Sequence, residues 1–394
     1  MTTDRPFSAR IVERIDQIDE TLWNAAADNC GAPYNPFIDH RFLAALENSG
    51  SVGPGTGWRP IHIALETPDG APAGFAPCYL KTNSQGEYVF DHGFADAYER
   101  AGGSYYPKLQ VAVPFTPATG PRLLVAKDEN RPMAQAGLAA AMLGLMRQAD
   151  ASSVHVTFAT EDERALLLER GFLARDDQQF HWRNDGYGAY DDFLADLASR
   201  KRKQLKRERR DALSNGITVR RLTGADLTEA HWDAFFAFYM DTGARKWGRP
   251  YLNRRFFSLI GEAMPDNILL VMAERDGRPI AGALNFIGGD AIYGRYWGAL
   301  EEHPFLHFEV CYHQAIDAAI ERGLARVEAG AQGEHKLARG YRPVTTRSAH
   351  AFADPGLRHA VADYLKRERR YVAETQEELE AATPFRRGEP ADAE

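Results

Sequence analysis

The stretch from Leu269 to Tyr341 constrains the fold of this chain more than any other part of the sequence. It begins with three predicted strands, separated by the turn sequences DG at 276–277 and GGD at 288–290. Gly and Asp accept the positive φ of short hairpins, so these strands are expected to pair antiparallel. Apolar residues then recur at helical spacing over about 308–322, and a short strand at 325–329 precedes the polar turn GAQGEHKLARGY. This order of elements predicts a mixed sheet with a crossover helix in an α/β fold.

The first half of the chain repeats this order. A helix at 131–149 and a strand at 154–158 lead to the sequence ERGF, much as the second half leads to ARGY. Repetition of one unit predicts a tandem duplication. We therefore expect an N-terminal domain at 1–188, a basic helical linker at 189–214, a C-terminal domain at 215–375 and a flexible tail at 376–394. Residues 82–108 have no clear period and are expected to form a functional loop.

Composition limits the classes of function. The chain has 394 residues and a net charge of −8, so it has no overall bias towards nucleic acid. Its three cysteines are scattered, which fits a reducing compartment, and its histidines form no compact pattern of metal ligands. No signal peptide and no membrane-spanning run is recognisable, so a cytoplasmic protein without membrane insertion is expected. The oligomeric state stays open.

One segment departs from the acidic average. Positions 200–210 hold eight basic residues and one acidic residue. A solvated helix with few apolar anchors would explain this composition. A site for a phosphate-bearing substrate, a nucleotide or an aminoacyl-tRNA would explain it equally well. In the second interpretation the contacts would come from Arg202, Lys203, Lys206 and Arg207.

Several motifs resemble a known family. They are the segment NGITV at 215–219 after the basic helix, the helix after Pro304, and Lys336 followed by Gly340-Tyr341. The longer segments 91–120 and 307–341 extend the match over most of the chain. In these motifs the chain resembles Fem-type aminoacyltransferases and the FemAB-like proteins labelled peptidoglycan biosynthesis or recognition. The resemblance implies a tandem GNAT fold and amide formation between an activated acyl or aminoacyl donor and an amine-bearing acceptor, such as a peptide or a cell-wall precursor.

The donor is constrained by one departure from the GNAT pattern. Enzymes that use acetyl-CoA carry a glycine-rich loop before the crossover helix, where backbone N–H groups hold pyrophosphate. Here that loop reads EEHPFLH at 301–307, with two adjacent glutamates and no glycine. The loop therefore disfavours acetyl-CoA or another acyl-CoA, and the resemblance to Fem-type proteins, which lack this loop and use charged tRNA, implies an aminoacyl-tRNA as donor. A CoA-dependent N-acetyltransferase and a non-catalytic peptidoglycan-recognition protein remain the alternatives.

Candidate chemical groups cluster after the strand at 325–329. The resemblance implies that Lys336 anchors the substrate or stabilises the oxyanion, and His335 or Glu334 could accept the proton of the amine. An arginine on a central strand is costly to bury unpaired, so Arg295 is a candidate for holding a carboxylate or phosphate. The remaining candidates for substrate binding are Trp297, His307, Glu309, Arg339 and Tyr341 in the second half, and Asp91, His92, Tyr106 and Lys108 in the first.

Overall fold

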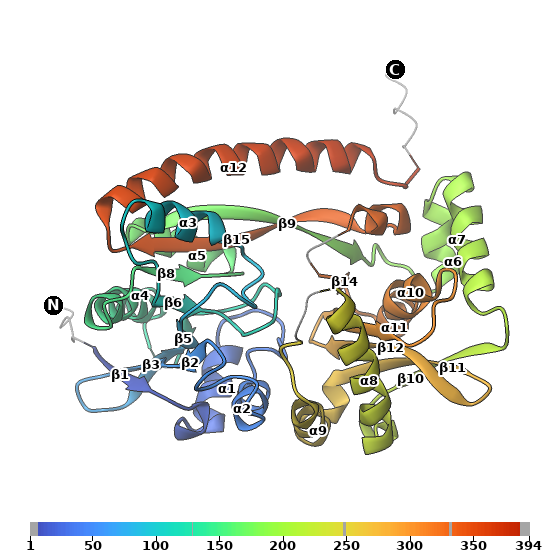
Figure 1. Cartoon of the computed structure of the whole chain (residues 1–394), viewed down its shortest axis with the longest axis horizontal. Coiled ribbons are helices and arrows are strands. Elements are labelled where there is room, and N and C mark those ends of the chain that lie inside the picture. The colour runs from blue at the N-terminus through green and yellow to red at the C-terminus, as the bar shows by residue number, and fades with distance from the viewer. Residues whose placement is uncertain (1–6, 128, 247–249, 331–332, 387–394) are drawn as a thin grey trace. The chain divides into compact units, whose positions relative to one another are not determined.

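The computed structural model of the chain describes residues 7–127, 129–246, 250–330 and 333–386, and it is a mixed α/β structure (Figure 1). Contacts divide the chain into two compact units. The first unit comprises residues 1–177, 251–263 and 345–373, and the second comprises 178–250, 264–344 and 374–394. Each unit is assembled from separate segments, whereas the domains expected from the sequence are contiguous.

In its described residues the first unit contains two groups of paired strands. β1 (Ser8–Val12), β3 (His62–Glu66), β4 (Pro72–Ala76) and β7 (Leu124–Val125) pair antiparallel in this order. β2 (Trp58–Pro60), β5 (Cys78–Lys81), β6 (Lys108–Val111) and β8 (Ser153–Val156) follow one another in the second group, where the end of β15 (Arg342–Phe352) pairs with β8. The helices are α1 (Glu20–Asp28), α2 (His40–Asn48), α3 (His92–Arg100), α4 (Arg131–Gln148), α5 (Glu161–Glu169), α9 (Arg254–Ala263) and most of α12 (Pro355–Ala381).

Helix α4 is the crossover connection of the first unit. It links β6 to β8, which are parallel, as such a connection requires. Asn130 caps its first turn by accepting a hydrogen bond from the backbone N–H of Met133. Leu138 and Met142, on one side of the helix, are fully buried in the core of the unit. The amphipathic pattern of this segment thus places the helix against the sheet.

The second unit contains the antiparallel meander predicted at 269–299. β10 (Ile217–Leu222), β11 (Ile268–Arg275), β12 (Arg278–Ile287) and β13 (Ala291–Ala299) pair in chain order, and β14 (Arg326–Glu328) joins β13 in parallel. The last residues of β9 (Leu173–Arg183) pair with β14. The helices are α6 (Tyr190–Asp196), α7 (Ser199–Ala212), α8 (Glu229–Lys246), α10 (Leu306–Phe308) and α11 (Gln314–Glu321), with a π-helical turn at Glu309–His313 between α10 and α11.

Three segments differ from the sequence-based expectation. Residues 82–108, expected to form a loop, contain helix α3. In the segment expected to be a linker, α6 and α7 bury Phe193 and Leu205 in the core of the second unit. Helix α12 continues to Ala381, so the tail expected from 376 begins inside a helix, and residues 387–394 lie outside the described part. No helix of the described residues is both long and apolar enough to cross a membrane.

Candidate active site

The candidate site of the second unit lies where β13 and β14 part. Only the first three residues of β13 pair with β14, and from Gly294 onwards the two strands separate. At the same point the register between β12 and β13 shifts, because Asn285 lies opposite Gly294 and Leu284 opposite Tyr296. Arg295 is therefore an extra residue, and a bulge of this kind leaves backbone outside the ladder. The parting strands and the bulge create an opening in the middle of the sheet.

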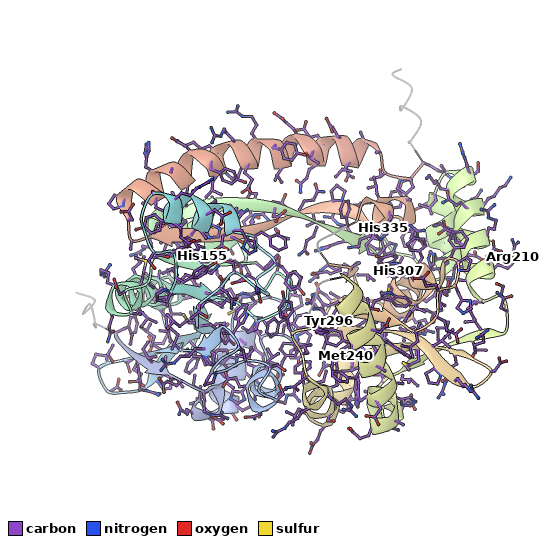
Figure 2. The ribbon with its side chains drawn as sticks, in the orientation of Figure 1. His155, Arg210, Met240, Tyr296, His307 and His335 are labelled. Atoms are coloured by element: carbon purple, nitrogen blue, oxygen red, sulfur yellow. The ribbon has the colours of Figure 1, made fainter. Side chains whose placement is uncertain are left out.

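A cavity of about 100 Å³ occupies this opening. Its walls come from β12, from β13, from the helical segment after Phe305 and from the residue after β14. They comprise Ala283, Leu284, Asn285, Gly294, Arg295, Tyr296, Trp297, His307, Cys311, Tyr312 and Ala329. The Trp297 and His307 rings lie 5.0 Å apart, and His307 lies 5.4 Å from the Tyr312 ring (His307 and Tyr296 are labelled in Figure 2). An opening lined by aromatic rings and a few polar groups suits a small organic group.

The bulge also changes the side chains predicted for β13. Simple alternation predicts that Arg295 and Trp297 share one face and that Tyr296 points to the other. That prediction is wrong, because the extra residue resets the alternation. Trp297 shares its face with Gly294, while the Arg295 guanidinium lies over the Tyr296 ring at 5.1 Å. Arg295 and Trp297 both line the cavity nevertheless.

Lys336 lies beside the cavity wall. Its side chain is 2% exposed, and its ammonium donates a hydrogen bond of 2.9 Å to the carbonyl oxygen of Gly330, next to Ala329 in the wall. Burial lowers the pKa of Lys336 to about 8, and the electrostatic effect of Cys311 acts in the opposite direction. Within the described part of the chain this ammonium donates one hydrogen bond, and a buried ammonium of this kind can stabilise a nearby negative charge.

His335 forms a hydrogen bond with Tyr312, which lines the cavity. The Tyr312 hydroxyl and Nε2 of His335 are 2.9 Å apart, so one donates to the other (His335 is labelled in Figure 2). Tyr341 packs its ring 5.6 Å from that of Tyr312 and is fully buried. The side chain of Glu334 lies outside the described part of the structure. Of the predicted proton acceptors, His335 is therefore the one whose contacts are described.

Arg339 and Glu309 are tied into the helical wall of the second unit. The Arg339 guanidinium lies over the Phe308 ring at 3.2 Å and donates to Glu208 of α7 at 2.8 Å. Glu309 is 1% exposed and accepts two hydrogen bonds from Arg209 of α7. Their charges are neutralised by neighbours, so both residues hold α7 against the helix that lines the cavity. Both were predicted to bind substrate, and the structure shows these structural contacts instead of free groups.

The loop before the crossover helix is poorly suited to pyrophosphate. The Glu301 carboxylate is held by Arg275 at 2.9 Å and by His303 at 2.8 Å, and these contacts lower its pKa. The backbone N–H groups of Leu306 and Phe308 already donate to carbonyl oxygens of the same turn. A bound anion would need such N–H groups to be unoccupied.

Helix α7 presents a basic surface. The predicted anion contacts on it are Arg202, Lys203, Lys206 and Arg207. Among the residues that the structure describes, Lys206 pairs with Asp191 and Arg207 with Asp211, while the other two form no ion pair. Arg200 and Lys201 extend the row at the start of the helix. Within the described residues, the first four cations of α7 therefore have no carboxylate partner.

The predicted residues of the first unit form a buried ionic network. Lys108 is fully buried and donates to Asp91 at 2.6 Å and to Ser84 at 2.8 Å, and Tyr105 also donates to Asp91. The ammonium of Lys108 and a hydrogen bond from Ser84 help to keep the pKa of Asp91 well below its ordinary value, although burial opposes this. Tyr106 reaches Ser84 at 2.8 Å.

The network extends through Tyr105 to two histidines. Tyr105 reaches Nε2 of His155 at 3.3 Å, and Nδ1 of His155 lies 2.7 Å from Nδ1 of His350 (His155 is labelled in Figure 2). Burial lowers the pKa of His155 to about 3. His92, in contrast, is exposed and stacks on Phe90. The structure thus brings Asp91, Tyr106 and Lys108 together and leaves His92 apart.

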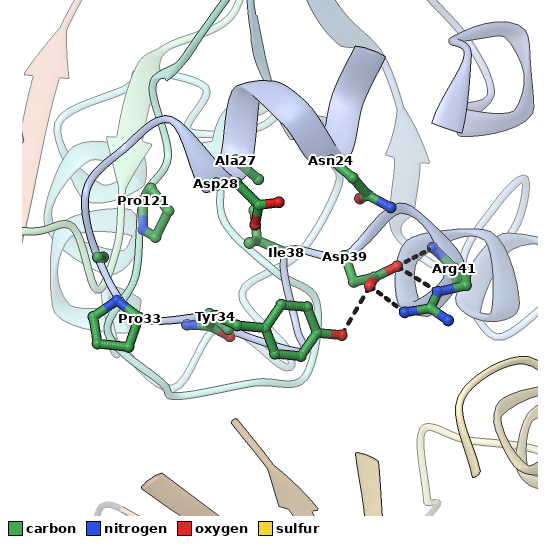
Figure 3. Close-up of a pocket in the computed structure, with 11 residues that line it drawn as sticks. Asn24, Ala27, Asp28, Pro33, Tyr34, Ile38, Asp39, Arg41 and Pro121 are labelled. Atoms are coloured by element: carbon green, nitrogen blue, oxygen red, sulfur yellow. Dashed lines mark hydrogen bonds and ion pairs between the residues drawn. The ribbon is translucent and has the colours of Figure 1, made fainter. Parts of the chain in front are cut away.

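A second cavity, of about 210 Å³, lies in the first unit between α1 and α2 (Figure 3). Asp39 caps α2 and is held by Arg41 and by the Tyr34 hydroxyl, which donates to it at 2.8 Å. Asp28, at the end of α1, points into the space in Figure 3. The sequence analysis did not single out these residues, because a polar loop before a helix is expected to be capped in this way.

Several cavity residues also escaped the sequence analysis, among them Asn285 and Gly294 on the strands and two residues of the helical wall, Tyr312 and Cys311. Tyr312 was interpreted only as part of an apolar stripe, and Cys311 only as a scattered cysteine. Both depend on the π-helical turn at Glu309–His313, whose extra residue changes which side chains point to the sheet. No group of His, Cys, Asp and Glu side chains suited to a metal ion is found among the described residues.

The two units, each a mixed sheet with a crossover helix between parallel strands, define a tandem GNAT-fold protein. The chain belongs to the FemAB-like family, since residues 14–387 match the family described as peptidoglycan biosynthesis/recognition. No curated protein matches the chain.

Solved structures support the same fold. FemX is similar at 14% identity with a TM-score of 0.54, over 88% of this chain and 98% of that chain. The C-terminal domain of a putative lysylphosphatidylglycerol synthetase from Agrobacterium fabrum is similar at 9% identity with a TM-score of 0.54, over 88% and 96%. A conserved protein of unknown function from Bacteroides thetaiotaomicron is similar at 9% identity with a TM-score of 0.51, over 88% and 100%. At these identities the similarity concerns the fold alone.

Proposed function

We propose that this protein is an N-acyltransferase that moves an aminoacyl group from an activated donor to an amine-bearing acceptor, with the reaction taking place in the cavity of the second unit. The observation that carries the proposal is the position of the Lys336 ammonium beside the opening between β13 and β14. Membership of the FemAB-like family supports it.

The proposed step requires two contributions from the protein, stabilisation of an oxyanion and transfer of a proton. The neutral amine of the acceptor attacks the acyl carbonyl, so a C–N bond forms and the carbonyl oxygen becomes negative. The buried ammonium of Lys336 stabilises that oxyanion. The tetrahedral intermediate then breaks its bond to the leaving oxygen or sulfur. The Tyr312–His335 pair takes the proton from the amine and returns it to the leaving atom, so protons balance over the cycle.

An aminoacyl-tRNA is the donor that the charges favour. The loop at 301–307 carries two adjacent carboxylates and no glycine, and the N–H groups of Leu306 and Phe308 are occupied. Helix α7 carries a row of cations and is fixed to the helical wall of the cavity through Arg209 and Glu309. The sugar-phosphate backbone of a tRNA bound along α7 would thus be held by the same unit that contains the cavity. With this donor the reaction belongs to the cytoplasm, and a cell-wall precursor with a free amine is the acceptor that the family suggests.

Calorimetric titration with acetyl-CoA and with free CoA tests the choice of donor. We expect no saturable heat with either ligand. Micromolar binding shared by both would instead identify a CoA-dependent N-acetyltransferase and contradict our interpretation of the Glu301 loop.

Charge reversal on α7 tests the tRNA site. Arg202→Glu with Lys203→Glu should weaken binding of charged tRNA at least tenfold and flatten its dependence on salt. The matched control reverses two exposed cations of α12, Arg367→Glu with Arg370→Glu, and should leave binding unchanged. If both pairs of substitutions weakened tRNA binding equally, binding would depend only on the net charge of the protein. The proposal that α7 is the tRNA site would then be wrong.

A further inference from the structure

One polar side chain interrupts the apolar face of β12 that packs under the crossover helix. Ala281, Ala283 and Ile287 alternate on this face and belong to the core of the second unit. Asn285 has the same parity and is 1% exposed. Its partner across the sheet, Gly294, is the residue at which β13 leaves β14. An amide in this position needs an explanation that packing does not supply.

The orientation of this amide is fixed by its neighbours. Nδ2 of Asn285 donates to the carbonyl oxygens of Leu269 at 3.1 Å and of Ala283 at 3.4 Å. Exchanging the two amide atoms would place Oδ1 against those carbonyl oxygens, so Oδ1 must lie on the other side. There it overlies Gly294, where an added Cβ would come within 3.4 Å of it.

Oδ1 has no hydrogen-bond donor among the described residues, although it is shielded from solvent. A buried acceptor without a partner costs about 1–3 kcal/mol, and an apolar side chain in this position would avoid that cost. Both Asn285 and Gly294 line the cavity, so the missing donor can come from a group bound there.

The position of Oδ1 relative to the bulge limits the chemical identity of the bound group that can donate to it. Arg295, the bulged residue, directly follows Gly294 and lines the same cavity as Asn285, so an acyl group bound in this cavity lies next to Oδ1. Because the cavity holds only about 100 Å³, a donor that reaches Oδ1 must be attached close to the carbonyl carbon. An acetyl group offers only a methyl there, while an aminoacyl group offers its α-amino group.

We infer that Asn285 is a specificity residue whose Oδ1 accepts a hydrogen bond from the α-amino group of the transferred aminoacyl moiety. The inference rests on the proposed function, because it assigns the acyl group to this cavity. Asn285 thereby selects aminoacyl donors over acyl donors without an amino group. Gly294 is part of the same subsite, since a Cβ there would lie 3.4 Å from Oδ1 and occupy the space beside it.

Three stable amides of 3′-amino-3′-deoxyadenosine test the inference by titration. They carry an alanyl, a propionyl or a 2-hydroxypropionyl group, and so differ only in the α-substituent. The wild-type protein should bind the alanyl amide about tenfold more tightly than the propionyl amide, the worth of one hydrogen bond. Asn285→Leu should remove this preference while still binding both compounds. The matched control, Asn267→Leu, changes a half-buried asparagine of the same unit outside the cavity and should keep the preference.

Each other outcome has a definite meaning. Equal binding of the alanyl and propionyl amides by the wild-type protein, or an unchanged preference in Asn285→Leu, would overturn this inference alone. Tightest binding of the 2-hydroxypropionyl amide would also overturn it, because a hydroxyl would then be the preferred donor. Binding of none of the three amides would overturn the proposed aminoacyl transfer, and this inference with it. The thermal midpoint of Asn285→Leu should equal or exceed that of the wild type, which separates lost recognition from lost folding.

Discussion

Replacing Lys336 with methionine should make the protein more stable and abolish its activity. The side chain is 2% exposed, and burial lowers the pKa of its ammonium from 10.5 to about 8. A difference of this size corresponds to about 3 kcal/mol of unfavourable free energy in the folded state at pH 7. Methionine has a similar length and no charge to desolvate. It loses one hydrogen bond to Gly330, worth about 1 kcal/mol, so the net gain should be about 2 kcal/mol.

The stability that Lys336→Met gains over the wild type should depend on pH in a defined direction. Below pH 8 the lysine is charged in both states, and the folded wild type carries the full penalty. Between pH 8 and 10.5 the folded state loses its proton while the unfolded state keeps it, so the wild type becomes more stable as pH rises. Above that range the lysine is neutral in both states. The difference in the free energy of unfolding between Lys336→Met and the wild type should therefore decrease as the pH rises from 8 to 10.5.

Differential scanning fluorimetry of the two proteins from pH 6 to 10.5 measures this difference. Other titrating groups are shared and cancel in the comparison. At pH 7 the midpoint of the variant should lie higher by about 2–4 °C per kcal/mol. A variant that is less stable than the wild type at pH 7, or a difference independent of pH, would refute the argument that a buried ammonium is held at a cost. In the wild type, activity should decline above pH 8 as the ammonium is lost.

Three further substitutions test other parts of the structure. Asp91→Asn leaves the Lys108 ammonium buried with weaker partners and should lower the free energy of unfolding in urea by about 3–5 kcal/mol, so an unchanged midpoint would argue against the buried network. Arg209→Met leaves Glu309 buried without its cation and should cost a similar amount, whereas a loss of activity at unchanged stability would indicate direct substrate contact. Gly298→Ala places a Cβ 2.2 Å from a backbone carbonyl oxygen of α8 and should lower the thermal midpoint by several degrees, and a neutral result would show that α8 can shift.

Much of the second unit follows from local sequence signals. The turns at 276–277 and 288–290 define three strands, and the period of the following segment defines the crossover helix. These signals are strong because hairpin turns and helical periodicity depend on residues close together in the chain. The structure confirms the predicted antiparallel meander and the order of its elements. The family follows from long motifs and is confirmed by the match over residues 14–387.

What the sequence could not provide depends on non-local geometry. The register shift opposite Asn285 depends on how two strands pair, so it cannot be predicted from any single residue. The path of β9 and β15, each of which starts in one unit and ends in the other, could not be predicted from a contiguous repeat. Likewise the ion pairs of Glu309 and Asp91 join segments far apart in the sequence, so a charged residue that holds the fold together resembles one that binds substrate.

Isotope transfer is the most direct test of the proposed activity. Transfer RNA charged with labelled amino acids would be mixed with a peptide bearing a free ε-amine, and labelled peptide would be measured by mass spectrometry. Parallel reactions would use the wild type, Lys336→Met and a control, Lys366→Met, at an exposed lysine of α12. We expect labelled amide with the wild type and the control, and at least a hundredfold less with Lys336→Met. Equal product from all three proteins, or product from acetyl-CoA but from no aminoacyl-tRNA, would contradict aminoacyl transfer at Lys336.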